Sequence, residues 1–131
     1  MDHHEPLSER EEQIATAVVD AAYTVHSAFG PGVQENIYET CFCYELGKRG
    51  FSCRRQVHVP LIYDGQKFDD AVRLDVLVEE LVICELKAVE AIIPLHHAQI
   101  LTQLKLTKKR LGFLINFNVP VIKDGIKRFV L

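Results

Sequence analysis

The spacing of the apolar residues changes near residue 50, and this change most constrains what the chain can fold into. Before it, apolar residues recur every three to four positions over about 8–29 and about 34–48, which predicts two amphipathic helices. After it, strand-like runs cover 53–62, 68–78 and 81–88, with a hairpin turn at Asp64-Gly65. A third helix is expected from Pro94 to about Arg110, followed by strands over 112–117 and 126–131 with a turn at 123–125 between them. This order predicts an α/β fold.

Local signals mark the ends of the first helices. Ser8 and Glu11 form a capping-box sequence, in which each side chain can bond a free backbone amide at the start of the first helix. Gly30-Pro31-Gly32 ends that helix, because proline cannot continue the hydrogen-bond ladder and glycine tolerates the reversal. Glu35 falls in the first turn of the second helix, where the helix dipole favours a carboxylate; this is its simplest interpretation.

Length and composition predict one globular domain spanning residues 1–131. With 48% hydrophobic and 25% charged residues, the chain can close one core and is too short for two ordinary domains. No apolar run reaches the length of a membrane span, and residues 1–6 lack the features of a secretory signal. We therefore expect a cytoplasmic protein that does not enter membranes. Free buried thiols are favoured over metal or disulfide roles because CxxC spacing is absent among Cys41, Cys43, Cys53 and Cys84.

The net charge of −3 counts against a non-specific coat protein for nucleic acid, since the molecule as a whole does not attract polyanions. It does not exclude an enzyme that acts on nucleic acid. Carboxylates that hold a metal lower the formal charge, while the bound cation restores local attraction. Basic residues are grouped at 48–49, 54–55 and 108–110, and each group is most simply a solvated surface.

Three charged residues interrupt the otherwise apolar strands. Glu85 and Lys87 are two positions apart, so on a strand they project from one face, and Asp75 lies on the preceding strand. Two neighbouring carboxylates are oxygen ligands that suit Mg²⁺, which keeps several waters and bridges to substrate phosphate. A lysine beside them could orient or activate the attacking water and stabilise developing charge. The same spacing is equally well explained by an ordinary cross-strand pair of Glu85 and Lys87 on a wet sheet face.

The metal-site hypothesis makes a geometric demand on the strands. If residues 78 and 81 flanked a two-residue turn, Asp75 would pair with Cys84 and face away from Glu85. A shared site therefore requires a loop of odd length, such as Glu79 to Leu81, or a bulge in one strand.

The expected third helix carries His96, Gln99 and Gln103 along one polar face. From there these side chains could reach water or phosphate near the metal, or they could simply face solvent. The spacing leaves both interpretations open.

A longer series of motifs extends this picture. One of them is Gly32-Val33-Gln34-Glu35-Asn36-Ile37-Tyr38, and the series covers nearly the whole chain. The other segments are Val25-His26, Pro31-Gly32, Arg73-Leu74-Asp75, Glu85-Leu86-Lys87-Ala88-Val89, Ala98-Gln99, 112–117 and 123–128. Together they resemble the GxxExxY proteins, a group placed in the PD-(D/E)XK nuclease superfamily.

The resemblance implies a restriction-endonuclease-like αβββαβ core, with a mixed central sheet flanked by helices. It implies that Asp75 and Glu85 are metal-binding acids, that Lys87 is the catalytic lysine, that Glu35 is the acid of the first core helix, and that Gln99 is the polar residue of the following helix. Two positions depart from the pattern. Leu74 replaces the proline before the motif aspartate, and Gln103 stands where an aromatic residue is expected.

These observations lead to a hypothesis of Mg²⁺-dependent hydrolysis of phosphodiester bonds in nucleic acid, with Mn²⁺ as an alternative ion. Glu35, Asp75 and Glu85 would form the metal-binding acidic site, and Lys87 and Gln99 would complete the catalytic set. The alternative is a catalytically inactive module that keeps the nuclease fold for binding or assembly, favoured by the lack of an aromatic or basic track. A regulatory small-ligand site in the same cleft is a third interpretation. Apolar strands at the C-terminal edge also favour pairing into a homodimer.

Overall fold

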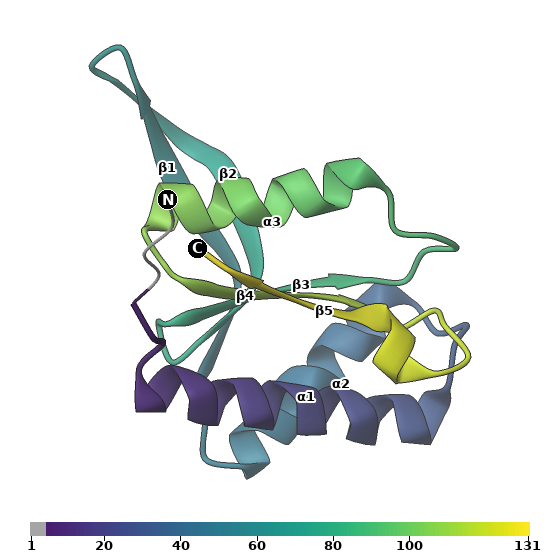
Figure 1. Cartoon of the computed structure of the whole chain (residues 1–131). Helices are drawn as coiled ribbons and strands as arrows, with labels where there is room; N and C mark the ends of the chain where they lie inside the picture. Colours follow the sequence, from purple (N-terminus) through teal and green to yellow (C-terminus); the bar gives the residue numbers. More distant parts are fainter. Residues whose placement is uncertain (1–4) are drawn as a thin grey trace.

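The computed structural model describes residues 5–131, which fold into one five-stranded sheet with helices on both faces (Figure 1). Residues 1–4, part of the stretch behind the expectation of a cytoplasmic location, lie outside the described residues. The strands lie side by side in chain order, β3 and β4 are parallel, and the other neighbours are antiparallel. The predicted mixed α/β architecture is therefore confirmed. Its elements are α1 (Glu9–Phe29), α2 (Glu35–Lys48), β1 (Cys53–Tyr63), β2 (Gln66–Val78), β3 (Val82–Lys87), α3 (Pro94–Thr107), β4 (Leu111–Asn116), η1 (Ile122–Gly125) and β5 (Ile126–Val130).

The capping box forms as predicted at the start of α1. The Ser8 N–H donates to Glu11 Oε1 at 2.8 Å, and the Glu11 N–H donates to Ser8 Oγ at 3.0 Å. One face of the helix is apolar at helical spacing, and it packs on the sheet with almost no exposed surface. The buried residues of this face are Ile14, Ala15, Ala17, Val18, Ala21, Ala22 and Val25.

The two faces of the sheet pack against different helices. α1 and α2 cover one face, and α3 covers the other (Figure 1). On the α3 side, Leu77 and Ile83 pack with Ile100 and Leu104 of the helix. Gly112 lets α3 approach closely, since a Cβ there would lie 3.0 Å from the Ile100 side chain. Side chains alternate between the two faces of a strand, so the residues two positions from Leu77 on β2 and from Ile83 on β3 project from this same face. This alternation determines which charged side chains of the two strands point toward α3.

Tyr38 fixes the connection between α1 and α2. Its hydroxyl donates to the Gly30 carbonyl at 2.5 Å and accepts from the Val33 N–H at 3.2 Å. Its ring, fully buried, stacks on Phe117 with centroids 4.6 Å apart. These contacts hold the start of α2, and with it Glu35, beside the end of β4.

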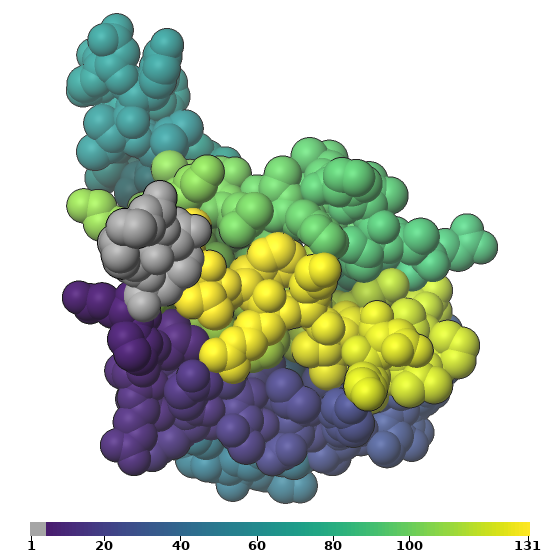
Figure 2. Space-filling model, in the orientation of Figure 1, coloured from purple at the N-terminus to yellow at the C-terminus, as the bar shows by residue number. Residues whose placement is uncertain are grey.

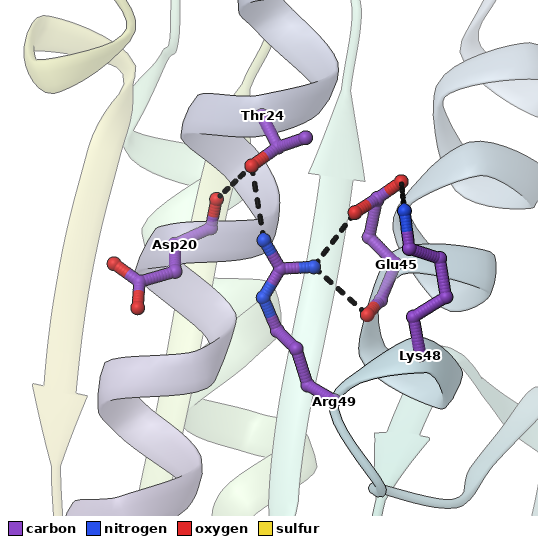
Figure 3. Close-up of polar contacts among 5 residues, drawn as sticks. All are labelled: Asp20, Thr24, Glu45, Lys48 and Arg49. Carbon is purple, nitrogen blue, oxygen red and sulfur yellow. Dashed lines mark hydrogen bonds and ion pairs between the residues drawn. The ribbon is translucent and has the colours of Figure 1, made fainter.

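A second set of contacts joins α1 to the end of α2 (Figure 3). Arg49 donates to Thr24 Oγ1 at 3.0 Å, and to the carbonyl and a carboxylate oxygen of Glu45 at 2.9 and 2.7 Å. The Thr24 hydroxyl donates to the Asp20 carbonyl at 3.0 Å, and Lys48 pairs with Glu45 at 3.4 Å. The helix pair is therefore tied at both ends.

The outer halves of β1 and β2 form an arm that projects beyond α3 (Figures 1 and 2). Its tip is the predicted Asp64-Gly65 turn, where both residues have positive φ, 53° and 72°. Ile62 and Tyr63, next to the turn, are 70% and 72% exposed. The arm rises beside the α3 face of the sheet and forms one wall of the cleft described below.

Some details differ from the sequence-based expectations. α3 ends at Thr107 rather than near Arg110, because Lys108 adopts the left-handed conformation with φ 57° and closes the helix. All four cysteines are free, as predicted, but only Cys84 is buried, and the other three are half-buried. In residues 5–131, no helix has both the length and the apolar character needed to cross a membrane.

Candidate functional site

The connection between β2 and β3 satisfies the geometric demand made by the sequence. Val78 pairs with Val82, so the loop between them has three residues, Glu79 to Leu81. In this register Asp75 stands opposite Glu85, and both side chains project toward α3. The Asp75 N–H donates to Glu85 Oε1 at 3.2 Å, and the Leu86 N–H donates to Asp75 Oδ2 at 2.9 Å. The two predicted acids therefore share one face of the sheet.

Side chains from outside the hairpin hold this loop. Glu79 and Glu80 have φ values of 53° and 57°, a conformation that residues other than glycine rarely adopt. The Glu79 carboxylate accepts from the Ser52 N–H and Oγ at 2.6 and 2.8 Å, and it pairs with Arg10. These contacts, led by the Ser52 N–H, lower the pKa of Glu79 to about 2. The register of the acidic pair therefore depends on contacts with α1 and with the residue before β1.

An open cleft of about 640 Å³ lies between the β2 arm, the end of β3 and α3. Arg73 and Asp70 line it from the arm, and Ala98 and Thr102 line it from the helix. All the side chains predicted to be catalytic line this same cleft, namely Glu35, Asp75, Glu85, Lys87 and Gln99. Segments far apart in the sequence therefore bring the predicted residues to one place.

The acidic pair lies in an environment that disfavours two negative charges. Glu85 is only 5% exposed, and its pKa is raised to about 7, first by burial and then by the Asp75 charge. Burial also raises the pKa of Asp75, with a further contribution from Glu39, while the Leu86 N–H, Lys87 and Arg73 act in the opposite direction. A cation in the cleft would relieve both effects.

Lys87 lies beside the pair at the end of β3. Its Nζ is 4.0 Å from Glu85 Oε2, and its side chain is 20% exposed. The backbone here is held by β4 and the residues after it. The Phe117 N–H donates to the Lys87 carbonyl at 2.9 Å, and buried Asn116 exchanges two hydrogen bonds with the Val89 backbone. The lysine is thus carried on a rigid strand end and reaches into the cleft.

Glu35 lines the cleft from the first turn of α2. The residue as a whole is exposed, but its carboxyl is partly buried, which raises its pKa, and the charge of Asp75 raises it further. Across the described part of the chain, no three His, Cys, Asp or Glu side chains are close enough together to hold a metal ion. The structure therefore does not bring Glu35 into a three-carboxylate cluster with Asp75 and Glu85.

The three polar residues predicted on one face of α3 have different surroundings. His96 Nδ1 accepts from the Ile93 N–H at 3.2 Å, so this ring bonds the start of the helix. Gln99 is exposed and lines the cleft, whereas Gln103 is 7% exposed and lies next to Glu85. The sequence pattern indicated the polar face but not which of its members is buried.

Glu39 is a buried acid near the site that no sequence signal indicated. It is 6% exposed and accepts two hydrogen bonds from Arg55, at 2.9 and 2.8 Å, and one from Gln56 at 2.6 Å. Because both partners come from β1, these contacts join α2 to the edge of the sheet. Glu39 also adds to the negative potential that raises the pKa of Asp75.

The donor atoms of the pair fit a hard divalent cation. Each carboxylate uses one oxygen, Asp75 Oδ2 or Glu85 Oε1, to accept a backbone hydrogen bond. The other oxygens, Asp75 Oδ1 and Glu85 Oε2, accept no backbone hydrogen bond from the described residues. One or two carboxylates with several retained waters is the usual way in which proteins bind Mg²⁺. Asp75 and Glu85 could therefore hold such an ion without a third acidic side chain.

Comparison with known proteins agrees with this architecture. A family model described as the PD-(D/E)XK nuclease superfamily matches residues 12–129. The chain therefore belongs to the PD-(D/E)XK nuclease superfamily, and its mixed sheet between helices is the restriction-endonuclease-like fold predicted from the motifs. Neither curated proteins nor solved structures gave a significant match.

Proposed function

We propose that the chain is a Mg²⁺-dependent nuclease that hydrolyses phosphodiester bonds in nucleic acid. The observation that carries this proposal is the meeting of Asp75, Glu85 and Lys87 on one sheet face inside an open cleft. Membership of the nuclease superfamily supports the reaction class and the use of a divalent metal. The fold alone would not, because one scaffold can host several functions.

In this proposal the chain's own groups bind and orient the reactants. Asp75 and Glu85 hold the ion with the carboxylate oxygens that the backbone leaves free. When bound, the ion supplies Lewis-acid polarisation of the phosphate and lowers the pKa of a bound water. Lys87, beside Glu85, positions the attacking water and stabilises negative charge that develops on the phosphate.

Two further residues have supporting roles in the proposal. Gln99 lines the helix wall of the cleft, where an exposed amide can hydrogen-bond a phosphate oxygen or a water. Glu35 lines the same cleft from α2, where its charge adds to the attraction for a cation. We also propose that the chain is a GxxExxY protein and that it forms a homodimer through the edge strand β5.

The direct test compares cleavage of DNA and of RNA by the wild type and Lys87→Ala, each with Mg²⁺ or Mn²⁺. Lys127→Ala is the matched control, because Lys127 is exposed on β5 and does not line the cleft. We expect cleavage of at least one substrate by the wild type and the control, and a loss of about 100-fold or more in Lys87→Ala. Equal activity in Lys87→Ala and wild type would show that the cleavage does not come from this site.

A second candidate is a nuclease-fold binding module without catalysis. The absence of a cluster of three metal-binding side chains in residues 5–131 favours it. Calorimetric titration with Mn²⁺ separates the two, because a catalytic site should bind the ion and lose it in Asp75→Asn. Metal binding should also strengthen as pH rises through about 7, since the ion must displace the proton from Glu85. Wild type that binds no Mn²⁺ at pH 8 would favour the binding module.

A further inference from the structure

Gln103 combines deep burial with an unused hydrogen-bonding group. Gln103 is 7% exposed, and it lines the cleft next to Glu85. Its side-chain carbonyl oxygen, Oε1, is the one buried side-chain polar atom in the described chain that has no hydrogen-bond partner. Such orphaned acceptors are rare in folded proteins because their desolvation is not compensated.

The orientation of the Gln103 amide follows from its neighbour. Glu85 in its ionised form can only accept hydrogen bonds, so the group of Gln103 that interacts with it is the NH₂. This leaves Oε1 as the end of the amide without a partner. When Glu85 is ionised, turning the amide over would place two oxygens against each other, so the exchanged orientation is disfavoured in the state that binds a cation.

We propose that Gln103 is a positioning residue of the metal site: its NH₂ holds the Glu85 carboxylate, and its Oε1 accepts a hydrogen bond from a water molecule bound to the ion. This inference rests on the proposed function and deepens it. With two carboxylates as its protein ligands, Mg²⁺ or Mn²⁺ keeps several waters, whose hydrogens need acceptors in a cleft that is partly closed by α3. A buried amide oxygen beside one of the ligands is suited to this role.

Two comparisons within the chain support the assignment. Gln99 lies one helical turn earlier on the same wall, but it is exposed, so its polar atoms can bond solvent without any ligand. Position 103 is also where the motif pattern leads us to expect an aromatic residue. An aromatic side chain could fill this space without an amide oxygen, so glutamine introduces an acceptor that packing does not require.

The test measures Mn²⁺ affinity by titration calorimetry and the unfolding temperature without metal. The variants are Gln103→Leu and Gln103→Met, which keep the approximate size and remove both polar ends of the amide. Gln13→Leu is the matched control, because Gln13 is exposed on α1 and far in sequence from the cleft residues.

We expect Gln103→Leu and Gln103→Met to bind Mn²⁺ about 10- to 100-fold more weakly, the usual effect of removing a partner of a metal ligand. Their unfolding temperature without metal should change little, because removing the orphaned acceptor offsets the loss of the NH₂ contact to Glu85. Gln13→Leu should bind Mn²⁺ as wild type does, because Gln13 does not line the cleft.

Several outcomes would overturn the inference. If Gln103→Leu and Gln103→Met bind Mn²⁺ as wild type does, Gln103 has no part in binding. A fall of their metal-free unfolding temperature with unchanged affinity would show a purely structural residue, as would failure of both to fold. Wild type without Mn²⁺ binding would overturn the proposed function as well, so the two failures are distinguishable.

Discussion

Glu85→Gln should stabilise the metal-free protein at pH 8 by about 3 kcal/mol and leave it nearly unchanged at pH 4.5. The folded protein raises the pKa of this carboxyl from 4.5 to about 7, chiefly because the side chain is buried. Each pKa unit corresponds to about 1.4 kcal/mol. Glutamine has nearly the shape of a protonated glutamate and carries no charge, so the variant avoids the cost of ionising a buried acid.

The sign of the pH dependence follows from proton binding in the two states. Between pH 4.5 and about 7 the folded protein holds a proton on Glu85 that the unfolded chain has released. The Glu85 contribution to stability therefore falls as pH rises through this range, and it stays constant above it. The advantage of Glu85→Gln over wild type should grow over the same range and then level off.

Urea denaturation in EDTA at pH 4.5, 6 and 8 measures this difference. Glu90→Gln is the matched control, because Glu90 is exposed in the connection after β3. Its difference from wild type should stay within about 0.5 kcal/mol at each pH. A constant difference between Glu85→Gln and wild type across the three pH values would refute the reasoning, as would a variant less stable than wild type at pH 8. Either result would mean that burial does not hold this carboxyl neutral.

Three further predictions concern the fold around the site. Tyr38→Phe should destabilise the protein by about 1 kcal/mol in urea denaturation, because it removes the hydroxyl that donates to the Gly30 carbonyl. Glu79→Gln should lower the unfolding temperature at pH 7, and calorimetry should show the loss shrinking as pH falls from 4.5 through about 2, where wild type loses the same carboxylate contacts. Gly125→Ala should destabilise by about 2 kcal/mol or more, because a Cβ would lie 2.1 Å from a backbone carbonyl oxygen, whereas Gly47→Ala meets no atom within 4 Å and should not.

The secondary structure could be predicted because its signals are local. The capping box at Ser8, the Asp64-Gly65 turn and the change of period near residue 50 each depend on neighbours in the sequence, and each is present in the structure. The end of α3 was placed about three residues too late, since no glycine or proline marks Thr107 as the last residue. A left-handed lysine is a conformation that sequence alone gives little reason to expect.

The strand register that brings Asp75 opposite Glu85 could be predicted only in part. From the sequence we could predict that a shared site needs an odd-length loop or a bulge between β2 and β3. We could not predict whether the chain forms one. The loop that forms contains two glutamates in the left-handed region, and long-range contacts to Ser52 and Arg54 hold it. Such a turn has no local signature because its stability comes from residues more than twenty positions away.

The site residues also differ in how far their positions could be predicted from the sequence. That Asp75, Glu85 and Lys87 share a cleft follows from strand alternation and register. Glu35 and Gln99, which line the same cleft, were indicated only by the motif resemblance. The burial of Gln103 and Glu39 could not be predicted in this way, because helical periodicity shows a polar face without showing what covers it. Burial there depends on how closely α3 and α2 pack on the sheet.

Several features of the cleft are electrostatically unfavourable, and each would be relieved by a cation. Burial raises the pKa of both Asp75 and Glu85, the charge of Glu39 raises that of Asp75 further, and the charge of Asp75 raises that of Glu85 further. Gln103 Oε1 also lacks a partner. If these groups served only stability, apolar residues of similar size would serve better, because a buried charge needs compensation that the surrounding chain does not supply. A divalent cation with its waters would compensate all of them at once, by neutralising the carboxylates and supplying a donor to the amide oxygen. Under the proposed function, the shared direction of these costs would distinguish an ion site from an ordinary cross-strand pair. It would also explain how a chain of net negative charge could act on a phosphate substrate.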